Sequence, residues 1–321
     1  MKFSRLTALI ALALAATLSH AQSWPQKPVH LFVGFAPGGT TDLIARPMAD
    51  RLTKILGQTV LVENKAGATG IIAAEYVAKS APDGFNILIS PSDQFTIVPH
   101  MQSGMRFNPV KDFAFITTIA RGPILVLAHP SVPASNLKEL IALAKASPGK
   151  YGYATSGTGT GQHLTGELLK ERAGIDLIHI PYKGGGQAIT DLVGGQVPLA
   201  VLGSGPTLPQ VRAGKIKAIG LSTKSRLPSD PAMLTLDEQG LSGFDTSQWF
   251  LLAAPAGTPA DIIARLNKEV TAILNEPDFR QRLIGFGMLP APDTPEALRK
   301  TLEEESALWA KVIRDKGIKA E

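Results

Sequence analysis

The chain has 321 residues and a formal net charge of +5; it contains no cysteine, and 6% of its residues are aromatic. The absence of cysteine excludes disulfides, thiol catalysis, cysteine-ligated metals and lipid attachment through cysteine. The basic residues are spread along the chain with no run of five. With so few aromatic side chains, this composition argues against nucleic-acid binding.

The first 21 residues have the pattern of a secretory signal peptide. Lys2 and Arg5 form a basic start, residues 6–18 form an apolar stretch, and Ser19-His20-Ala21 is a small-x-small cleavage motif. We therefore expect cleavage after Ala21 and export to the periplasm, which leaves a net charge of +5 − 2 = +3. The alternative is an uncleaved N-terminal anchor, although the apolar stretch is shorter than the roughly 20 residues that span a bilayer.

The first half of the remaining chain alternates strand-like and helix-like segments. Apolar runs predict strands at residues 29–35, 59–63 and 85–90, and helical periodicity predicts helices at 42–56 and 70–79. This β-α-β-α-β order requires a parallel sheet with right-handed crossovers. Pro47 lies inside the first of these helices, where we expect it to remove a hydrogen bond and cause a kink.

The second half repeats the theme, and the length of the chain after the signal peptide, about 300 residues, favours two domains. The predicted strands are residues 151–154, 177–180, 199–202, 216–221 and 249–254, and the predicted helices are residues 162–173, 186–193, 260–275 and 295–316. Because no low-complexity linker separates the halves, we expect ordered crossover strands at residues 122–128 and 248–254. One lobe then contains residues 22–123 and 248–321, and the other contains residues 124–247.

Two glycine-rich turns are the most informative feature of the chain. Residues 35–42 read FAPGGTTD and residues 156–162 read SGTGTGQ, and each turn follows a strand and precedes a helix. Such a turn directs backbone N–H groups and a helix N-terminus at one point, which suits an anion. Thr40 or Thr41 is expected to cap the first helix, with Asp42 in its first turn. The alternative is an ordinary, well-capped strand-to-helix turn.

Three further turns follow predicted strands, at residues 90–94, 184–186 and 203–206. Open parallel sheets bind ligands at the carboxyl ends of their strands, so the five turns are expected to converge. Lys183 and Arg46 are the cationic residues near them. An anion would therefore be held mainly by N–H groups, hydroxyls and water, which favours a carboxylate over a phosphate.

Catalytic signatures are absent from the sequence. There is no GxSxG, HExxH or GxxxxGK[ST] motif, and the histidines are widely separated. We expect no enzyme activity, no metal and no cofactor. His163 lies just inside the helix after the second turn, where it either meets a ligand or makes a structural hydrogen bond.

Several blocks of the sequence together resemble the Bug receptors, the periplasmic solute-binding proteins of tripartite tricarboxylate transporters. The blocks are FAPGGTTDLIAR at residues 35–46, VENKAGATG at 62–70, YKGGG at 182–186 and APAGTP at 254–259. The resemblance extends over essentially the whole chain after residue 21. It implies an α/β, two-lobed Venus-flytrap fold of the type II periplasmic-binding-protein class, in which each lobe is a mostly parallel sheet flanked by helices.

The resemblance also implies the position of the ligand and its partners. A small carboxylate would be held by the two turns, partly through water, and passed to membrane permease subunits by a receptor that we expect to be monomeric. The residues implied for the carboxylate are Gly38, Gly39, Thr40, Thr41, Asp42, Ser156, Gly157, Thr158 and Gly161, and Phe35 is a further candidate for contact with the ligand. Those implied for the distal, selective side are Ser92, Asp93, Ser204 and Gly205.

One position departs from the family pattern and bears on the ligand. Phe250 follows Trp249 where a small residue is common in the family, so the floor of the cleft is expected to be bulkier. Asp42 either caps its helix or meets a ligand amine. Two alternative functions stay open at this point: an exported hydrolase-like α/β enzyme that acts on a carboxylate, and the ligand-sensing subunit of a signalling system.

Overall fold

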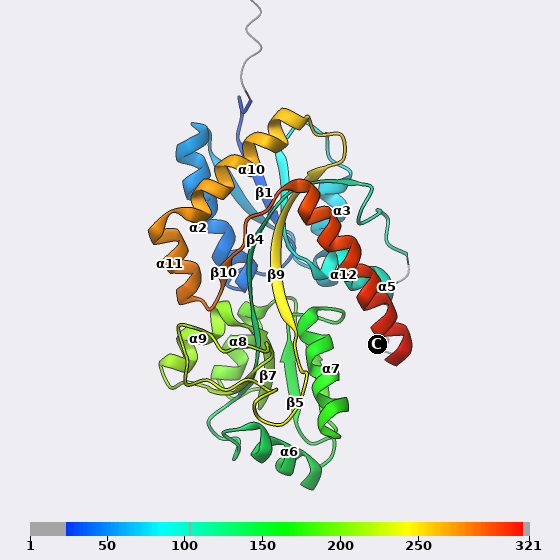
Figure 1. Cartoon of the computed structure of the whole chain (residues 1–321), viewed down its shortest axis with the longest axis vertical. Coiled ribbons are helices and arrows are strands. Elements are labelled where there is room, and N and C mark those ends of the chain that lie inside the picture. Colours follow the sequence, from blue (N-terminus) through cyan, green and yellow to red (C-terminus); the bar gives the residue numbers. More distant parts are fainter. Residues whose placement is uncertain (1–23, 103, 317–321) are drawn as a thin grey trace, which may run out of the picture.

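The computed structural model describes residues 24–102 and 104–316. The predicted signal peptide and its cleavage site lie outside these residues. Within the described ranges, no helix combines the length and the apolar character needed to cross a bilayer. The chain forms two lobes stacked along its long axis, joined by the strands β4 and β9 (Figure 1).

The first lobe, at the top of Figure 1, contains a mixed sheet in the order β2-β1-β3-β9-β4. The outer strands β2, β1 and β3 are parallel, whereas β9, β4 and the short β10 pair in antiparallel fashion. The strands of this lobe are β1 (Val29–Val33), β2 (Val60–Asn64), β3 (Asn86–Pro91), β4 (Phe113–Ala128), β9 (Ser247–Pro255) and β10 (Leu289–Pro290). Its helices are α2 (Thr40–Leu56), η1 (Ala68–Gly70), α3 (Ile71–Ala78), α4 (Asp93–Thr96), α5 (Val98–Met101), α10 (Ala260–Asn275), α11 (Pro277–Gly285) and α12 (Pro295–Lys316).

The second lobe is built in the same way. Strands β7, β5 and β6 are parallel, and β4 pairs with both β7 and β8 in antiparallel fashion. The strands are β5 (Gly152–Thr155), β6 (Ile178–Pro181), β7 (Leu199–Gly203) and β8 (Lys217–Leu221). The helices are α6 (Leu137–Ala146), α7 (Gly161–Ala173), α8 (Gly185–Val193) and α9 (Ser204–Arg212).

Strand β4 belongs to both sheets. Its residues up to Pro123 pair with β9, whereas its residues from Ile124 onward pair with β7 and β8. Strand β9 begins opposite this change of partner, with Ser247 facing Pro123. The two-lobed α/β fold is therefore confirmed, and both sheets are mixed because the crossover strands, β9 and β4 in the first lobe and β4 in the second, pair in antiparallel fashion.

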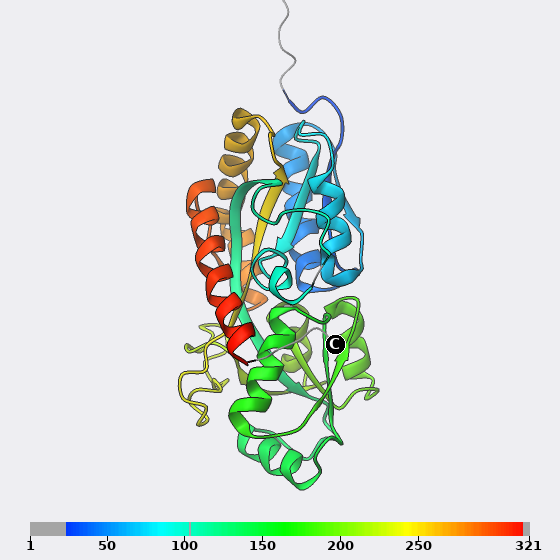
Figure 2. The same ribbon diagram turned by 90° about the vertical axis from the view of Figure 1, so that its right-hand side faces the viewer.

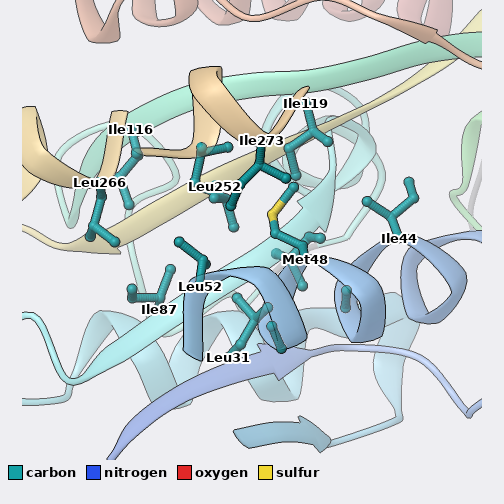
Figure 3. Packing of buried hydrophobic residues seen from close by; sticks show 14 of the residues in the cluster. Leu31, Ile44, Met48, Leu52, Ile87, Ile116, Ile119, Leu252, Leu266 and Ile273 are labelled. Carbon is teal, nitrogen blue, oxygen red and sulfur yellow. The ribbon is translucent and has the colours of Figure 1, made fainter. Parts of the chain in front are cut away.

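Each lobe has apolar cores on both faces of its sheet. In the first lobe, Met48 and Leu52 of α2 lie against Leu252 of β9 and Ile273 of α10 (Figure 3). All four side chains are at most 2% exposed. The expected interruption at Pro47 does not divide α2, which runs as one helix from Thr40 to Leu56. This packing fixes the N-terminus of α2 at the edge of the sheet that faces the second lobe.

The lobes lie in contact with each other. Helix α12 extends from the first lobe toward α7 of the second (Figure 2), where Ile313 packs against Leu164 and Ile97. On the other side, Ala36 N donates to Lys183 O at 3.1 Å and Thr69 Oγ1 donates to Thr158 O at 2.7 Å. The structure therefore has the lobes closed on each other.

Candidate ligand-binding site

Two neighbouring cavities lie between the lobes and share Phe35 and Ser156. The hinge-side cavity has about 20 Å³ open to a water-sized sphere, roughly the room that one water molecule needs. It is lined by Phe35, Gly39, Thr40, Thr41, Ser156, Thr160, Gln162, Gly185, Gln248 and Phe250. The outer cavity has about 290 Å³ and is lined by Gly34, Phe35, Gly67, Ala68, Thr69, Gly70, Gln102, Ser156, Gly157, Thr158, Pro181, Tyr182 and Lys183.

The first glycine turn brings the N-terminus of α2 to the hinge-side cavity. The helix begins at Thr40, and its N-cap is Gly39, which has extended backbone angles and no side-chain cap. The predicted cap by Thr40 or Thr41 is therefore wrong, because both threonines lie inside the helix. The first N–H groups of a helix have no partner within it. This uncapped terminus, with its partial positive charge, faces the cavity.

Asp42 holds the first turn together from the side away from the cavity. Its carboxylate accepts hydrogen bonds from Gly38 N at 3.1 Å, from Arg46 Nε and Nη2 at 2.9 Å each, and from Asn64 Nδ2 at 3.1 Å. Burial acts to raise the pKa of Asp42, but the hydrogen bonds and the charge of Arg46 outweigh it and lower the pKa. Asp42 lines neither cavity, so its position favours a structural role over contact with a ligand amine.

The second glycine turn uses most of its N–H groups within the protein. Ser156 N donates to Gln162 Oε1 at 2.9 Å, and Gly157 N donates to Thr155 Oγ1 at 3.1 Å. Thr160 caps α7, since its Oγ1 accepts from His163 N at 3.2 Å and donates to Gly157 O at 2.8 Å. The turn therefore faces the cavities with the side chains of Ser156, Thr160 and Gln162 rather than with a row of open N–H groups.

His163 supports the second turn from beneath. Its Nδ1 accepts from Gly159 N at 3.2 Å, and its ring stacks on His179 with a centroid separation of 4.0 Å. His179 bonds the Thr155 hydroxyl at 2.8 Å, and burial followed by the charge of His163 lowers its pKa to about 3. His163 lines neither cavity, so the structural interpretation of this residue is favoured.

The four residues implied for the distal side line neither cavity. Ser92 is buried before α4, and Ser204 Oγ donates to Gly287 O at 3.4 Å. Gly205 contacts Thr40, because a Cβ at this glycine would lie 2.9 Å from Thr40 Cγ2. Asp93 is 2% exposed and accepts from Gly161 N at 2.8 Å; burial raises its pKa to about 7. Asp93 and Gly161 thus bond to each other across the lobes.

Besides Phe250, four residues that line the hinge-side cavity were not among the predicted site residues: Thr160, Gln162, Gly185 at the start of α8 and Gln248 of β9. Gln248 Oε1 accepts from Gln162 Nε2 at 3.4 Å and closes the hinge-side cavity together with Phe250. The signal for Gln248 in the sequence was its position at the start of the predicted crossover strand, two residues before Phe250, which was expected in the floor of the cleft.

The chemistry of the cavities is that of a binding site. Among the described residues, the lining of the hinge-side cavity carries no charged side chain, and Lys183 is the charged residue of the outer one. Within the same residues, no group of three histidine, aspartate or glutamate side chains could hold a metal ion. Helix N–H groups, hydroxyls and amides are suited to holding a carboxylate in place.

Comparisons with known proteins agree with this geometry. The family model for the tripartite tricarboxylate transporter family receptor matches residues 44–318. Protein BugT of Bordetella pertussis is 33% identical, and the alignment covers 99% of each chain. The solved structure of R. palustris Rpa4515 with adipate is 34% identical, with a TM-score of 0.90 and coverage of 92% of this chain and 99% of that one.

A second solved structure extends the comparison to another bound acid. MatC (Rpa3494) from Rhodopseudomonas palustris with bound malate is 32% identical, with a TM-score of 0.86 and coverage of 90% of this chain and 100% of that one. The chain therefore belongs to the tripartite tricarboxylate transporter receptor family, as its motifs predicted, and is a periplasmic-type solute-binding receptor rather than an enzyme.

Proposed function

We propose that this receptor captures a small carboxylate, in particular an aliphatic dicarboxylate, between its lobes and delivers it to the membrane permease of its transporter. The observation that carries the proposal is the uncapped N-terminus of α2, which faces a cavity whose opposite wall consists of neutral donors on the second turn. A helix N-terminus stabilises a negative charge, and closure around it excludes water.

The proposed site consists of the cavity-lining residues. Gly39, Thr40 and Thr41 would contact one carboxylate from the first lobe, and Ser156 with Gln162 would contact it from the second. The rest of the ligand would extend into the outer cavity, where Lys183 is available for a second carboxylate. The adipate and malate in the two solved relatives support this ligand class.

We also propose the limits of the two lobes, the cleavage site and the oligomeric state. We place the lobe limits at residues 22–123 with 248–321 and at residues 124–247, where β4 changes its pairing partners. We further propose cleavage after Ala21 and a monomeric receptor in the periplasm. Mass spectrometry of the exported protein and light scattering test these two points.

A thermal-shift screen tests the proposed ligand class. The panel contains adipate, malate, citrate, aspartate and benzoate, with a sugar and a nucleotide for comparison. A ligand at about 100 times its dissociation constant adds roughly 2.7 kcal/mol to folded stability, which gives a clear shift. We expect a shift with at least one acid and none with the sugar or the nucleotide.

A matched pair of serine variants locates the binding site. Ser156→Ala removes a hydroxyl that lines both cavities, whereas Ser242→Ala removes an exposed hydroxyl elsewhere in the second lobe. We expect Ser156→Ala to weaken acid binding about three- to tenfold, the loss of about one hydrogen bond, and Ser242→Ala to leave it unchanged. The proposal is contradicted if none of the acids gives a thermal shift, or if Ser156→Ala and Ser242→Ala bind the acid equally well.

A further inference from the structure

One buried carboxylate links the two lobes without lining either cavity. Asp93 is the first residue of α4 in the first lobe, and Gly161 is the first residue of α7 in the second. Asp93 Oδ2 accepts from Gly161 N at 2.8 Å, and the aspartate is 2% exposed. The other interlobe hydrogen bonds described above involve no titratable side chain; they are Ala36–Lys183, Thr69–Thr158, Gln162–Gln248 and Ser204–Gly287.

The charged group that acts on Asp93 is a second carboxylate. Glu305 of α12 accepts from Trp249 Nε1 at 2.6 Å and from Trp309 Nε1 at 3.1 Å, and burial raises its pKa. Its negative charge adds to the effect of burial on the pKa of Asp93. Arg121 of β4 lies over the Trp249 ring at 4.8 Å and acts on Glu305.

The histidines on the neighbouring helices have their own partners. His163 of α7 bonds Gly159 N, and His100 of α5 bonds the Ser306 hydroxyl at 2.8 Å. Strand β9 contacts the residue before Asp93 through backbone atoms, since Ser92 N donates to Trp249 O at 2.9 Å. Closure of the lobes thus places Asp93 in a dry site beside a second acid.

We propose that closure of the lobes is coupled to the uptake of one proton by Asp93, a positioning residue for the second glycine turn, so that ligand affinity increases as the pH falls. When the lobes separate, the interlobe bond to Gly161 is broken and water reaches the carboxylate, which is then ionised. When they close, the protonated carboxyl keeps one oxygen as the acceptor for Gly161 N and removes the repulsion from Glu305. Asp93 acts on the ligand only through the turn that it holds.

The direction of the pH effect follows from the two states. In the closed state the pKa of Asp93 is raised to about 7, whereas a solvated aspartate titrates near 3.8. Between these values the closed form binds more protons than the open form, and above about pH 7 both forms are ionised. Affinity therefore increases as the pH falls from 7, by up to tenfold per unit and about thirtyfold between pH 8 and pH 5.5.

The test compares Asp93→Asn with the wild type and with Asp261→Asn, which changes an exposed aspartate in the first turn of α10. Calorimetry with adipate and with malate, from pH 5.5 to 8, gives the dissociation constants. Buffers of different ionisation enthalpy give the proton uptake. We expect the affinity ratio of wild type to Asp93→Asn to increase about thirtyfold toward pH 5.5, while Asp261→Asn follows the wild type. Dividing by the variant cancels the ionisation of the ligand itself.

A second measurement needs no ligand and so does not rest on the proposed function. Small-angle X-ray scattering of the ligand-free proteins should show the wild type becoming more compact as the pH falls from 8 to 5.5, because proton uptake by Asp93 favours closure, whereas the radius of gyration of Asp93→Asn should not depend on pH in this range. If the radius of gyration has the same pH dependence in wild type and in Asp93→Asn, the proposal is overturned. If only the wild type responds to pH and neither adipate nor malate binds, the proton site stands and the proposed ligand class fails. If an acid binds with the same pH dependence in both proteins, coupling to closure is overturned.

Discussion

The two glycine turns look alike in the sequence but have different structures. The first leaves the N-terminus of α2 without a side-chain cap and is held from behind by the ionic network of Asp42. The second is capped by Thr160 and held by neutral groups, including the His163 ring. One turn therefore offers backbone donors to the cavity, and the other offers a rigid surface of side chains.

This difference separates two tasks within one binding site. An uncapped helix end is costly unless a ligand or water satisfies it, so the first turn is suited to binding an anion. The second turn satisfies most of its donors within its own lobe, with Gly161 N as the exception, so most of its shape is kept when the lobes move apart. Variants that act on one turn at a time test this division.

The largest effect is expected where the second lobe meets the first turn. A Cβ at Gly186 of α8 would lie 2.2 Å from Pro37 O, a contact that exists only with the lobes closed. Gly186→Ala should therefore prevent full closure and weaken ligand binding at least a hundredfold, about 3 kcal/mol. Calorimetry with the acid identified in the screen measures this loss.

The control for this variant is Gly285→Ala at the end of α11, where a Cβ would have no neighbour within 4 Å. It should bind the acid like the wild type. Both variants should keep a free energy of unfolding within about 0.5 to 1 kcal/mol of the wild type, because alanine suits a helix. Tight binding by Gly186→Ala would show that the ligand is held without this contact.

The next effect concerns the ionic support of the first turn. Asp42→Asn replaces a carboxylate that receives hydrogen bonds from Gly38, Arg46 and Asn64. We expect a loss of about 2 kcal/mol in the free energy of unfolding at pH 7, moderated because the Arg46 side chain is 52% exposed. Denaturant titration of the variant and of Asp261→Asn measures the loss.

The pH dependence of this loss has a defined sign. The pKa of Asp42 is lowered in the fold, so its contribution to stability is present above the ordinary aspartate pKa of 3.8 and disappears as the pH falls through the lower folded pKa. The difference between wild type and Asp42→Asn should therefore be constant from pH 7 to about 5 and shrink below about 4. A difference that persists unchanged at pH 3 would rule out the ionic network as its source.

The sequence predicted more of the fold than of the site. Helical periodicity placed α10 (Ala260–Asn275), and apolar runs located β1 and β3 to within two residues. A turn was expected at residues 203–206, but α9 already begins at Ser204. The elements could be located because the spacing of apolar residues along the chain depends on which face of each strand or helix is buried.

The site was harder to predict because it depends on partners far apart in the chain. Gly39, Thr40, Thr41 and Ser156, which the glycine turns singled out, line one cavity, and their contact with a ligand stays a prediction. Nothing in the sequence indicated that Asp93 would accept from Gly161, 68 residues further on. A local motif predicts where a helix begins, whereas the occupancy of its N–H groups is decided by tertiary contacts.

The smallest effect is expected at the cap of the second turn. Thr160→Ala removes the acceptor for His163 N and the donor to Gly157 O, and loss of such a cap costs about 1 kcal/mol. The remaining bonds of the turn, from Ser156 N to Gln162 and from Gly159 N to His163, should keep its shape, so acid binding should weaken less than tenfold.

Thr190→Ala, which changes an exposed threonine on α8, serves as the control and should change stability by less than about 0.5 kcal/mol. A loss of binding in Thr160→Ala as large as that in Gly186→Ala would show that the second turn is an active donor rather than a preformed surface, and the distinction between the two turns would then fail.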